Sequence, residues 1–223
     1  MDKITIYHGS TKIIENPKYG VGKPYNDYGL GFYCTKNIEL AKEWACTSEN
    51  NGFANKYILD TRDLLVFHLS EMNILNWLAV LVSNRTFKIK GPLAIESKEY
   101  LEKEFLPDIK RYDVIYGYRA DDSYFSFAES FLNGGISLEQ LSRAMKLGNL
   151  GEQVVIKSKK AFDLMEYKGY EIASKEIYFT QRETRDIQAR NEYREISKSI
   201  KASESVYMLD ILREGWTDND ERL

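Results

Sequence analysis

The sequence is poor in the residues that would indicate a disulfide framework, a metal site or a membrane span. It has two cysteines and two histidines, which are too few for a disulfide scaffold or a zinc cluster. The longest apolar run, residues 74–82, is interrupted by Asn76 and is too short to cross a bilayer. No cationic start followed by an apolar segment precedes the first expected strand. We therefore expect a cytoplasmic protein with no metal and no membrane contact.

The charge is also close to balanced. There are 31 basic and 34 acidic residues, so the formal net charge is −3. This balance gives no overall electrostatic reason to expect a nucleic-acid partner. Hydrophobic residues make up 43% of the 223 residues and charged residues 29%, which is typical of a soluble globular protein with a full core.

Short apolar or alternating runs predict strands, and helical periodicity predicts helices. Strands are expected at residues 3–8, 29–34, 55–60, 64–68, 112–117 and 152–157. Helices are expected at residues 37–47, 71–84, 96–106, 123–132, 137–147, 159–165 and 176–200. Ser137, followed by an acid in the first turn, is the expected N-cap of its helix. Because strands and helices do not alternate strictly, the pattern favours an α+β fold.

The sequence changes character after residue 173. Residues 174–223 predict a C-terminal helical extension to a domain that spans residues 1–173. Its first helix is strongly charged and has a sparse apolar stripe of Ile187, Tyr193 and Ile196, and a second, apolar helix follows at residues 206–212. The extension is expected to pack on the domain or on a partner, or to be a plain helix pair that completes the fold.

Two motifs near the N-terminus are the most informative feature. The first expected strand ends in Tyr7-His8-Gly9-Ser10. A glycine-rich loop over residues 16–29 leads to the second motif, Tyr28-Gly29-Leu30-Gly31-Phe32-Tyr33. A helix that carries Ala41, Trp44 and Ala45 follows. Each piece taken alone has an ordinary explanation, as a tight turn or as a strand that packs in the core.

In this order and spacing, the motifs resemble the NAD-binding half of the ADP-ribosyltransferases. The resemblance is to the diphtheria-toxin-like and poly(ADP-ribose) polymerase branch, which uses a His-Tyr-Glu triad. Within that branch the whole chain looks like the bacterial family of unknown function numbered 3990. The resemblance implies a split antiparallel β core with surrounding helices, with NAD as co-substrate.

The resemblance also implies roles for individual residues. His8 would hydrogen-bond the adenosine ribose, which suits a neutral imidazole with one donor and one acceptor. The backbone of Gly9, with Ser10, would clamp the nicotinamide carboxamide, and Tyr33 would stack on the nicotinamide ring. The remaining expected binding residues are Gly29 and Gly31, on the same strand face as Tyr33, with Tyr28 as a second aromatic wall and Arg119 as a partner of the diphosphate.

The third triad position has two solutions. The run that begins at Gly151 resembles the strand that carries the family's glutamate, and that acid is either Glu152 or replaced by Gln153. The two side chains point to opposite faces of a strand, so only one of them can face a pocket. Alignment on the following apolar strand and on Ala161-Phe162 favours Gln153. A glutamine cannot balance positive charge by ionisation, so the substitution argues against polymerase activity.

The resemblance implies a mono-ADP-ribosyltransferase that modifies a protein or a nucleic acid. For small bacterial members it implies a toxin of a toxin–antitoxin or phage-defence system, with an antitoxin or another protein as partner. A catalytically weak or inactive NAD-binding module and an NAD glycohydrolase are the alternatives. RNA 2′-phosphotransferase chemistry on this fold ranks last, because it requires arginines near the first strands and the earliest arginine is Arg62.

Overall fold

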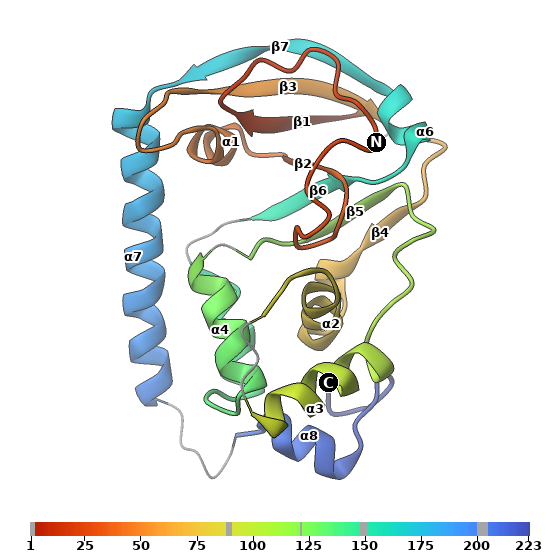
Figure 1. Cartoon of the computed structure of the whole chain (residues 1–223), viewed down its shortest axis with the longest axis vertical. Helices are drawn as coiled ribbons and strands as arrows, with labels where there is room; N and C mark the ends of the chain where they lie inside the picture. Colours follow the sequence, from red (N-terminus) through yellow and green to blue (C-terminus); the bar gives the residue numbers. More distant parts are fainter. Residues whose placement is uncertain (1–2, 88–90, 121, 148–150, 200–204) are drawn as a thin grey trace.

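A computed structural model describes residues 3–87, 91–120, 122–147, 151–199 and 205–223. Within these ranges the chain forms one seven-stranded sheet, eight α-helices and one short 3-10 helix (Figure 1). The strands are β1 (Lys3–Ser10), β2 (Phe32–Thr35), β3 (Gly52–Asp60), β4 (Val66–His68), β5 (Val114–Tyr118), β6 (Glu152–Ile156) and β7 (Met165–Ala173). The helices are α1 (Ile38–Ala45), η1 (Leu69–Glu71), α2 (Ile74–Asn84), α3 (Pro92–Glu104), α4 (Asp122–Leu132), α5 (Leu138–Ala144), α6 (Lys159–Asp163), α7 (Lys175–Ser199) and α8 (Met208–Glu214). The expected α+β class is confirmed.

The sheet is nearly divided into two parts. Its strand order is β4-β5-β6-β2-β1-β3-β7. The central pairing of β1 with β2 is limited to Tyr7 opposite Thr35, whereas β1 pairs with β3 along its whole length. In Figure 1, β1, β3 and β7 form one group and β2, β6, β5 and β4 form another. The expectation of an antiparallel core needs one correction, because β4 runs parallel to β5 and the sheet is therefore mixed.

All six predicted strands are present with shifted bounds, and a seventh was missed. The second strand begins at Phe32 rather than at residue 29, because Gly29 occupies a turn with φ of +71°. The strand β7 was missed, although Met165 and Tyr167 alternate with Glu166 and Lys168 as a strand with one half-buried face requires. The interior Gly169, at φ of +101°, weakened that pattern. β7 pairs with β3 and forms one edge of the sheet.

Apolar residues pack on both faces of the sheet. The larger hydrophobic cluster joins one face, through Ile115 and Val155, to α2, α4 and α5. A smaller cluster on the opposite face includes Ile6, Val154 and Ile156. Alternating residues of β6 therefore enter different cores, as the period of a strand requires. Both cysteines, Cys34 and Cys46, are buried as free thiols.

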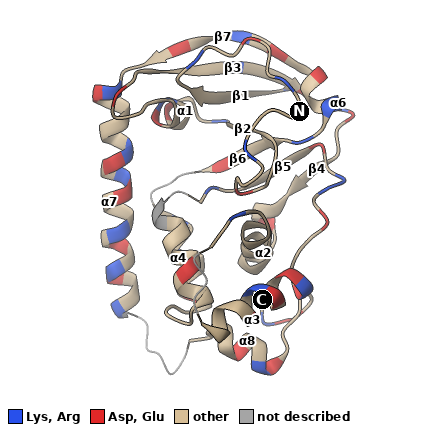
Figure 2. Ribbon diagram, viewed as in Figure 1, with Lys and Arg blue, Asp and Glu red and all other residues tan. Residues whose placement is uncertain are grey.

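The C-terminal helices pack directly on the rest of the chain. α7 runs beside α1 and α4 and carries acidic and basic side chains along its length (Figure 2). Arg185 of α7 forms an ion pair with Glu43 of α1, at 2.7 Å between Nη2 and Oε1. α8 contacts α3, and its residues Met208 and Ile211 belong to the larger cluster. Residues 200–204 of the predicted extension, including the last residue of the helix expected at 176–200, lie outside the described residues.

The helix starts follow from local capping. The Ser137 hydroxyl oxygen accepts a hydrogen bond from the backbone amide of Gln140, and the side-chain oxygen of Gln140 accepts one from the backbone amide of Ser137. This predicted N-cap is therefore confirmed as a full capping box. Asn37 and Asn73 cap α1 and α2 through their side-chain oxygens, which accept from backbone amides of the first turn. No helix in the described part of the chain is long and apolar enough to span a bilayer.

Candidate functional site

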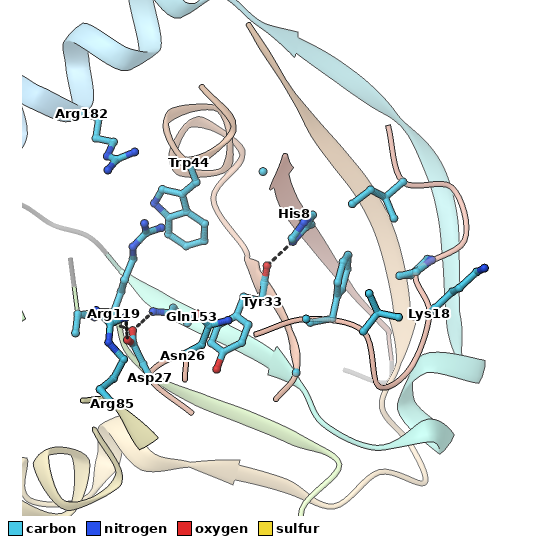
Figure 3. A pocket seen from close by; sticks show the side chains of 18 residues that line it. His8, Lys18, Asn26, Asp27, Tyr33, Trp44, Arg85, Arg119, Gln153 and Arg182 are labelled. Atoms are coloured by element: carbon cyan, nitrogen blue, oxygen red, sulfur yellow. Dashed lines mark hydrogen bonds and ion pairs between the residues drawn. The ribbon is translucent and has the colours of Figure 1, made fainter. Parts of the chain in front are cut away.

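A cavity of about 600 Å³ opens where β1 and β2 separate (Figure 3). Side chains from distant parts of the sequence line it. They include His8 of β1, Tyr33 of β2 and Gln153 of β6, together with residues of the loop between β1 and β2, Trp44 of α1 and Arg182 of α7. The division of the sheet thus places three of the predicted site residues on one cavity.

The two ring nitrogens of His8 differ in their surroundings. One bonds to the backbone of a neighbouring strand, and the ring also lines the cavity. Its Nδ1 lies 2.7 Å from the backbone carbonyl oxygen of Tyr33. A carbonyl only accepts, so Nδ1 carries the proton and Nε2 of the neutral ring is an acceptor. The ring stacks on Phe32 with 4.2 Å between centroids. Burial lowers the pKa of His8 and the bond to Tyr33 opposes that shift, so the neutral form is favoured near neutral pH.

Tyr33 is fixed at its hydroxyl end. The phenol donates to the carbonyl oxygen of Gly29 at 2.6 Å and accepts from the amide of Tyr28 at 3.0 Å. Burial raises the pKa of the Tyr33 phenol, so it is neutral and able to donate. Its ring lines the cavity while its hydroxyl closes the turn that precedes β2. The residue therefore offers a flat aromatic surface at a constrained position.

The strand β6 places Gln153 at the cavity and Glu152 outside it. Gln153 is buried, lies on the same strand face as Val155, and lines the cavity. Glu152 lies on the opposite face, where it accepts a hydrogen bond from the hydroxyl of Ser70. Of the two expected alternatives for the third position, Gln153 is the one that the fold brings to His8 and Tyr33.

Asp27 is a buried acid at the cavity that we did not predict as a site residue. Its Oδ2 lies 3.0 Å from Gln153 Nε2 and 3.1 Å from the amide nitrogen of Ala120, and its Oδ1 lies 3.0 Å from Arg85 Nη1. Burial raises the pKa of Asp27, while Ala120, Arg85 and Gln153 act against that shift. The carboxylate thus joins the loop between β1 and β2 to α2, to the end of β5 and to β6.

Basic side chains exceed acidic ones around the cavity. Within the described residues its lining includes four basic side chains and one acid: Lys18, Arg85, Arg119, Arg182 and Asp27. The guanidinium of Arg119 lies over the ring of Trp44, at 4.0 Å from the centroid. The Nε1 atom of Trp44 is buried and has no hydrogen-bond partner among the described residues. This excess of positive charge suits an anionic ligand.

The other residues of the first motif have structural roles. A Cβ atom at Gly9 would lie 2.1 Å from the backbone oxygen of Ala41 and 2.8 Å from the amide of Ala45, so the absence of a side chain lets α1 pack against β1. Gly9 still contributes backbone to the cavity lining. Ser10 is not part of that lining, and its hydroxyl accepts from the amide of Lys12 at 3.1 Å.

The second motif is also divided between the cavity and the core. Gly31 lines the cavity, whereas Gly29 precedes β2 and does not line it. Both glycines precede β2, so the expectation that they share a strand face with Tyr33 was wrong. Tyr28 is 1% exposed, lies outside the cavity lining, and donates through its hydroxyl to the carbonyl oxygen of Tyr118 at 2.6 Å. Arg119, the expected diphosphate partner, does line the cavity.

Sequence reasoning missed Asp27, Arg85 and Arg182. Asp27 was part of the predicted loop but had no assigned role, although a lone acid among glycines and tyrosines is a usable signal. Arg85 follows the apolar helix α2 and carries no local signal. Arg182 lies in a helix rich in charges of both signs, so nothing local separates it from its neighbours. In the part of the chain that the structure describes, no group of three or more His, Cys, Asp or Glu side chains is placed to hold a metal ion.

The chain is an α+β protein with one polar cavity. Hydrogen-bond acceptors and arginine side chains line this cavity. The chain belongs to a family described as a protein of unknown function, DUF3990, whose model matches residues 4–167. This range begins within β1 and ends within β7, so it includes His8, Tyr33 and Gln153 but not Arg182. No curated protein and no solved structure matches the chain significantly.

Proposed function

We propose that the protein is an NAD-dependent mono-ADP-ribosyltransferase that binds NAD in the cavity between β1 and β2. One observation carries the proposal. His8, Tyr33 and Gln153 come from three strands, and the fold brings them to a single cavity with the arginines Arg119 and Arg182. These are the residues that the resemblance to the His-Tyr-Glu branch selects, with glutamine in place of the acid.

The groups of the cavity match the parts of NAD. His8 Nε2 accepts a hydrogen bond from a ribose hydroxyl, and the Oε1 atom of Gln153 accepts from another. The ring of Tyr33 provides a flat surface for the nicotinamide, which adds about 0.5–1.5 kcal/mol beyond the burial of area. Arg119 and Arg182 face the diphosphate, because a planar guanidinium fits phosphate oxygens.

In the reaction, the bond between the nicotinamide nitrogen and C1′ of its ribose breaks, and neutral nicotinamide leaves with the electron pair. A nucleophile of the acceptor then bonds to C1′ and loses its proton to the solvent or to a nearby base. The transition state carries positive charge on the ribose, so immobilised hydroxyls and acceptor atoms nearby favour it. A neutral glutamine stabilises this charge less than a carboxylate does, which fits transfer of a single unit better than polymer synthesis.

A second candidate is an NAD-binding module without turnover. It is favoured by the same residue, because Gln153 is hydrogen-bonded to Asp27 and has no charge of its own. An NAD glycohydrolase, in which water takes the place of the acceptor, is a third. For the transferase, the resemblance suggests a role as a bacterial toxin, with a protein or nucleic acid as acceptor and with an antitoxin as partner.

Nicotinamide release from NAD separates these candidates. It is measured with purified protein alone and with added cell lysate, and beside the variants Tyr33→Ala and Gln153→Ala. We expect release that requires lysate, is lost in both variants, and deposits label on a macromolecule. Release without lysate would indicate the glycohydrolase, and binding without release would indicate the module.

The variant Arg194→Ala provides the matched control, because Arg194 lies on α7 outside the cavity lining. It is expected to release nicotinamide at the wild-type rate. A loss in this variant as large as in Tyr33→Ala would show that the losses do not report on the cavity, and would contradict the assignment of the site.

A further inference from the structure

The contact between Asp27 and Gln153 determines which end of the glutamine amide faces the cavity. The two side chains are buried, at 5% and 4% exposure, and Asp27 Oδ2 lies 3.0 Å from Gln153 Nε2. A carboxylate only accepts, so the amide must turn its nitrogen toward Asp27. Its oxygen, Oε1, is then directed away from Asp27, and it has no hydrogen-bond partner among the described residues.

Asp27 is itself held in place by two other elements. Arg85, the C-cap residue of α2, donates to Oδ1 at 3.0 Å, and the backbone amide of Ala120, just after β5, donates to Oδ2 at 3.1 Å. The guanidinium of Arg85 also lies over the ring of Phe125 in α4, at 5.0 Å from the centroid. Because both oxygens of Asp27 accept hydrogen bonds, rotation of the carboxylate away from Gln153 would break them. Figure 3 shows Asp27 between Arg85 and Gln153.

We propose that Asp27 is a positioning residue that fixes the amide of Gln153 so that Oε1 is presented to the ligand as a hydroxyl acceptor. This inference deepens the proposed function and rests on it for the identity of the ligand. Asp27 acts through Gln153, since its own oxygens already accept from Arg85, Ala120 and Gln153.

Contact with Asp27 gives a reason for glutamine at residue 153, where the family that the chain resembles has glutamate. A glutamate at residue 153 would place a second carboxylate against Asp27, and like charges at hydrogen-bond distance cannot both ionise without a large cost. Glutamine instead offers a donor to Asp27 and an acceptor to the cavity at the same time. Asp27 therefore carries the negative charge, and Gln153 contacts the ligand.

The first test uses no ligand. The side-chain amide protons of Gln153 are followed by nitrogen-15 NMR, beside those of the exposed Gln188. We expect the Gln153 protons to exchange with solvent at least tenfold more slowly than those of Gln188. We also expect this protection to be lost in Asp27→Ala. Equal exchange for the two glutamines in the wild type would overturn the proposal, whether or not the protein binds NAD.

The second test uses combined substitutions and the binding of NAD. In Gln153→Glu, repulsion from Asp27 is expected to weaken NAD binding at least tenfold. In the double variant Asp27→Asn/Gln153→Glu the repulsion is gone, so affinity is expected to recover by at least fivefold relative to Gln153→Glu. In Asp27→Asn alone, the new amide nitrogen is a donor that must face another donor, either Arg85 or Gln153. The affinity for NAD is therefore expected to fall about tenfold.

The surface variant Glu139→Gln controls for the loss of one acid, because Glu139 is exposed on α5 and pairs with Arg143. It should bind NAD as the wild type does, and thermal unfolding of every variant identifies those that fail to fold. The proposal would be contradicted if the losses of NAD affinity in Asp27→Asn and in Gln153→Glu simply added in the double variant. Failure of the wild type to bind NAD would reject the proposed function and leave the NMR result to decide on Asp27.

Discussion

The Nδ1 atom of His8 donates to the backbone carbonyl oxygen of Tyr33 across 2.7 Å, and this bond joins the two strands where the sheet divides. It has two consequences. It fixes the tautomer of the ring, with Nε2 as acceptor, and it holds β2 beside β1 one step beyond their single paired position. In the proposed function, the side chain that joins the two strands also accepts a hydrogen bond from the ligand.

The tautomer of His8 predicts a pH dependence. Burial lowers the pKa of His8 below its ordinary value of about 6.5. Ligand affinity should be constant near neutral pH and should decrease as the pH falls through the folded-state pKa, because a protonated Nε2 no longer accepts. Stability should decrease in the same direction, since the unfolded chain binds the proton more readily than the folded one. Calorimetric titration with NAD from about pH 8 to about pH 5 tests the first statement.

The other histidine provides the control for this titration. His68 is exposed and lies beside Glu71, outside the cavity lining. The pH dependence of binding should persist in His68→Gln and disappear in His8→Gln. An unchanged pH profile in His8→Gln would show that another group is responsible.

Removal of the Tyr33 hydroxyl should destabilise the fold more than it weakens ligand binding. The change Tyr33→Phe leaves the carbonyl of Gly29 and the amide of Tyr28 without their partner, at a cost of about 1–3 kcal/mol of unfolding free energy. The ring that lines the cavity remains, so NAD affinity should change by less than about threefold. Urea denaturation and calorimetry measure the two effects, and Tyr25→Phe, at a tyrosine that is 68% exposed, is the matched control.

A side chain at Gly9 should separate α1 from β1. In Gly9→Ala the new methyl group would overlap the backbone of Ala41 and Ala45, which cannot move without shifting the helix. We expect a loss of at least about 1–3 kcal/mol in unfolding free energy. The neighbouring change Ser10→Ala should cost much less, because among the described residues the Ser10 hydroxyl makes one hydrogen bond, an exposed one from the amide of Lys12. Equal stability of Gly9→Ala and the wild type would contradict this packing.

The ion pair between Glu43 and Arg185 should anchor α7 to α1. The Glu43 side chain is 2% exposed and that of Arg185 is 29% exposed, so Arg185→Ala leaves a nearly buried carboxylate uncompensated. We expect a loss of about 2 kcal/mol or more. In Arg143→Ala, which breaks an exposed pair with Glu139, the loss should stay below about 1 kcal/mol. Similar losses in the two variants would refute the anchoring role.

Local sequence signals were enough for most of the elements. The apolar run at the start of β1 and the cap Ser137 act over a few residues, so their effect can be seen in the sequence. The edge strand β7 could have been predicted from its alternation. It was missed because its polar residues and the interior Gly169 interrupt the apolar face of the strand.

Most residues of the candidate site that were predicted from the sequence stand in a motif. His8, Tyr33 and Gln153 stand in motifs, and the fold brings them to one cavity. Asp27 and Arg85 meet across 58 positions of the sequence, and Asp27 and Gln153 across 126. Such contacts depend on how the loop between β1 and β2 folds back on α2 and β6, which no local pattern determines. The close approach of α1 to Gly9 was hidden for the same reason.

Equilibrium binding of NAD to the purified protein tests the central claim most directly. Calorimetric titration is made with the wild type and with Arg182→Ala and Arg194→Ala, which remove one arginine each from α7. The account predicts one saturable site, binding weakened at least tenfold in Arg182→Ala because a phosphate partner at the cavity is lost, and binding unchanged in Arg194→Ala. Absence of binding to the wild type, or equal loss in the two variants, would contradict it.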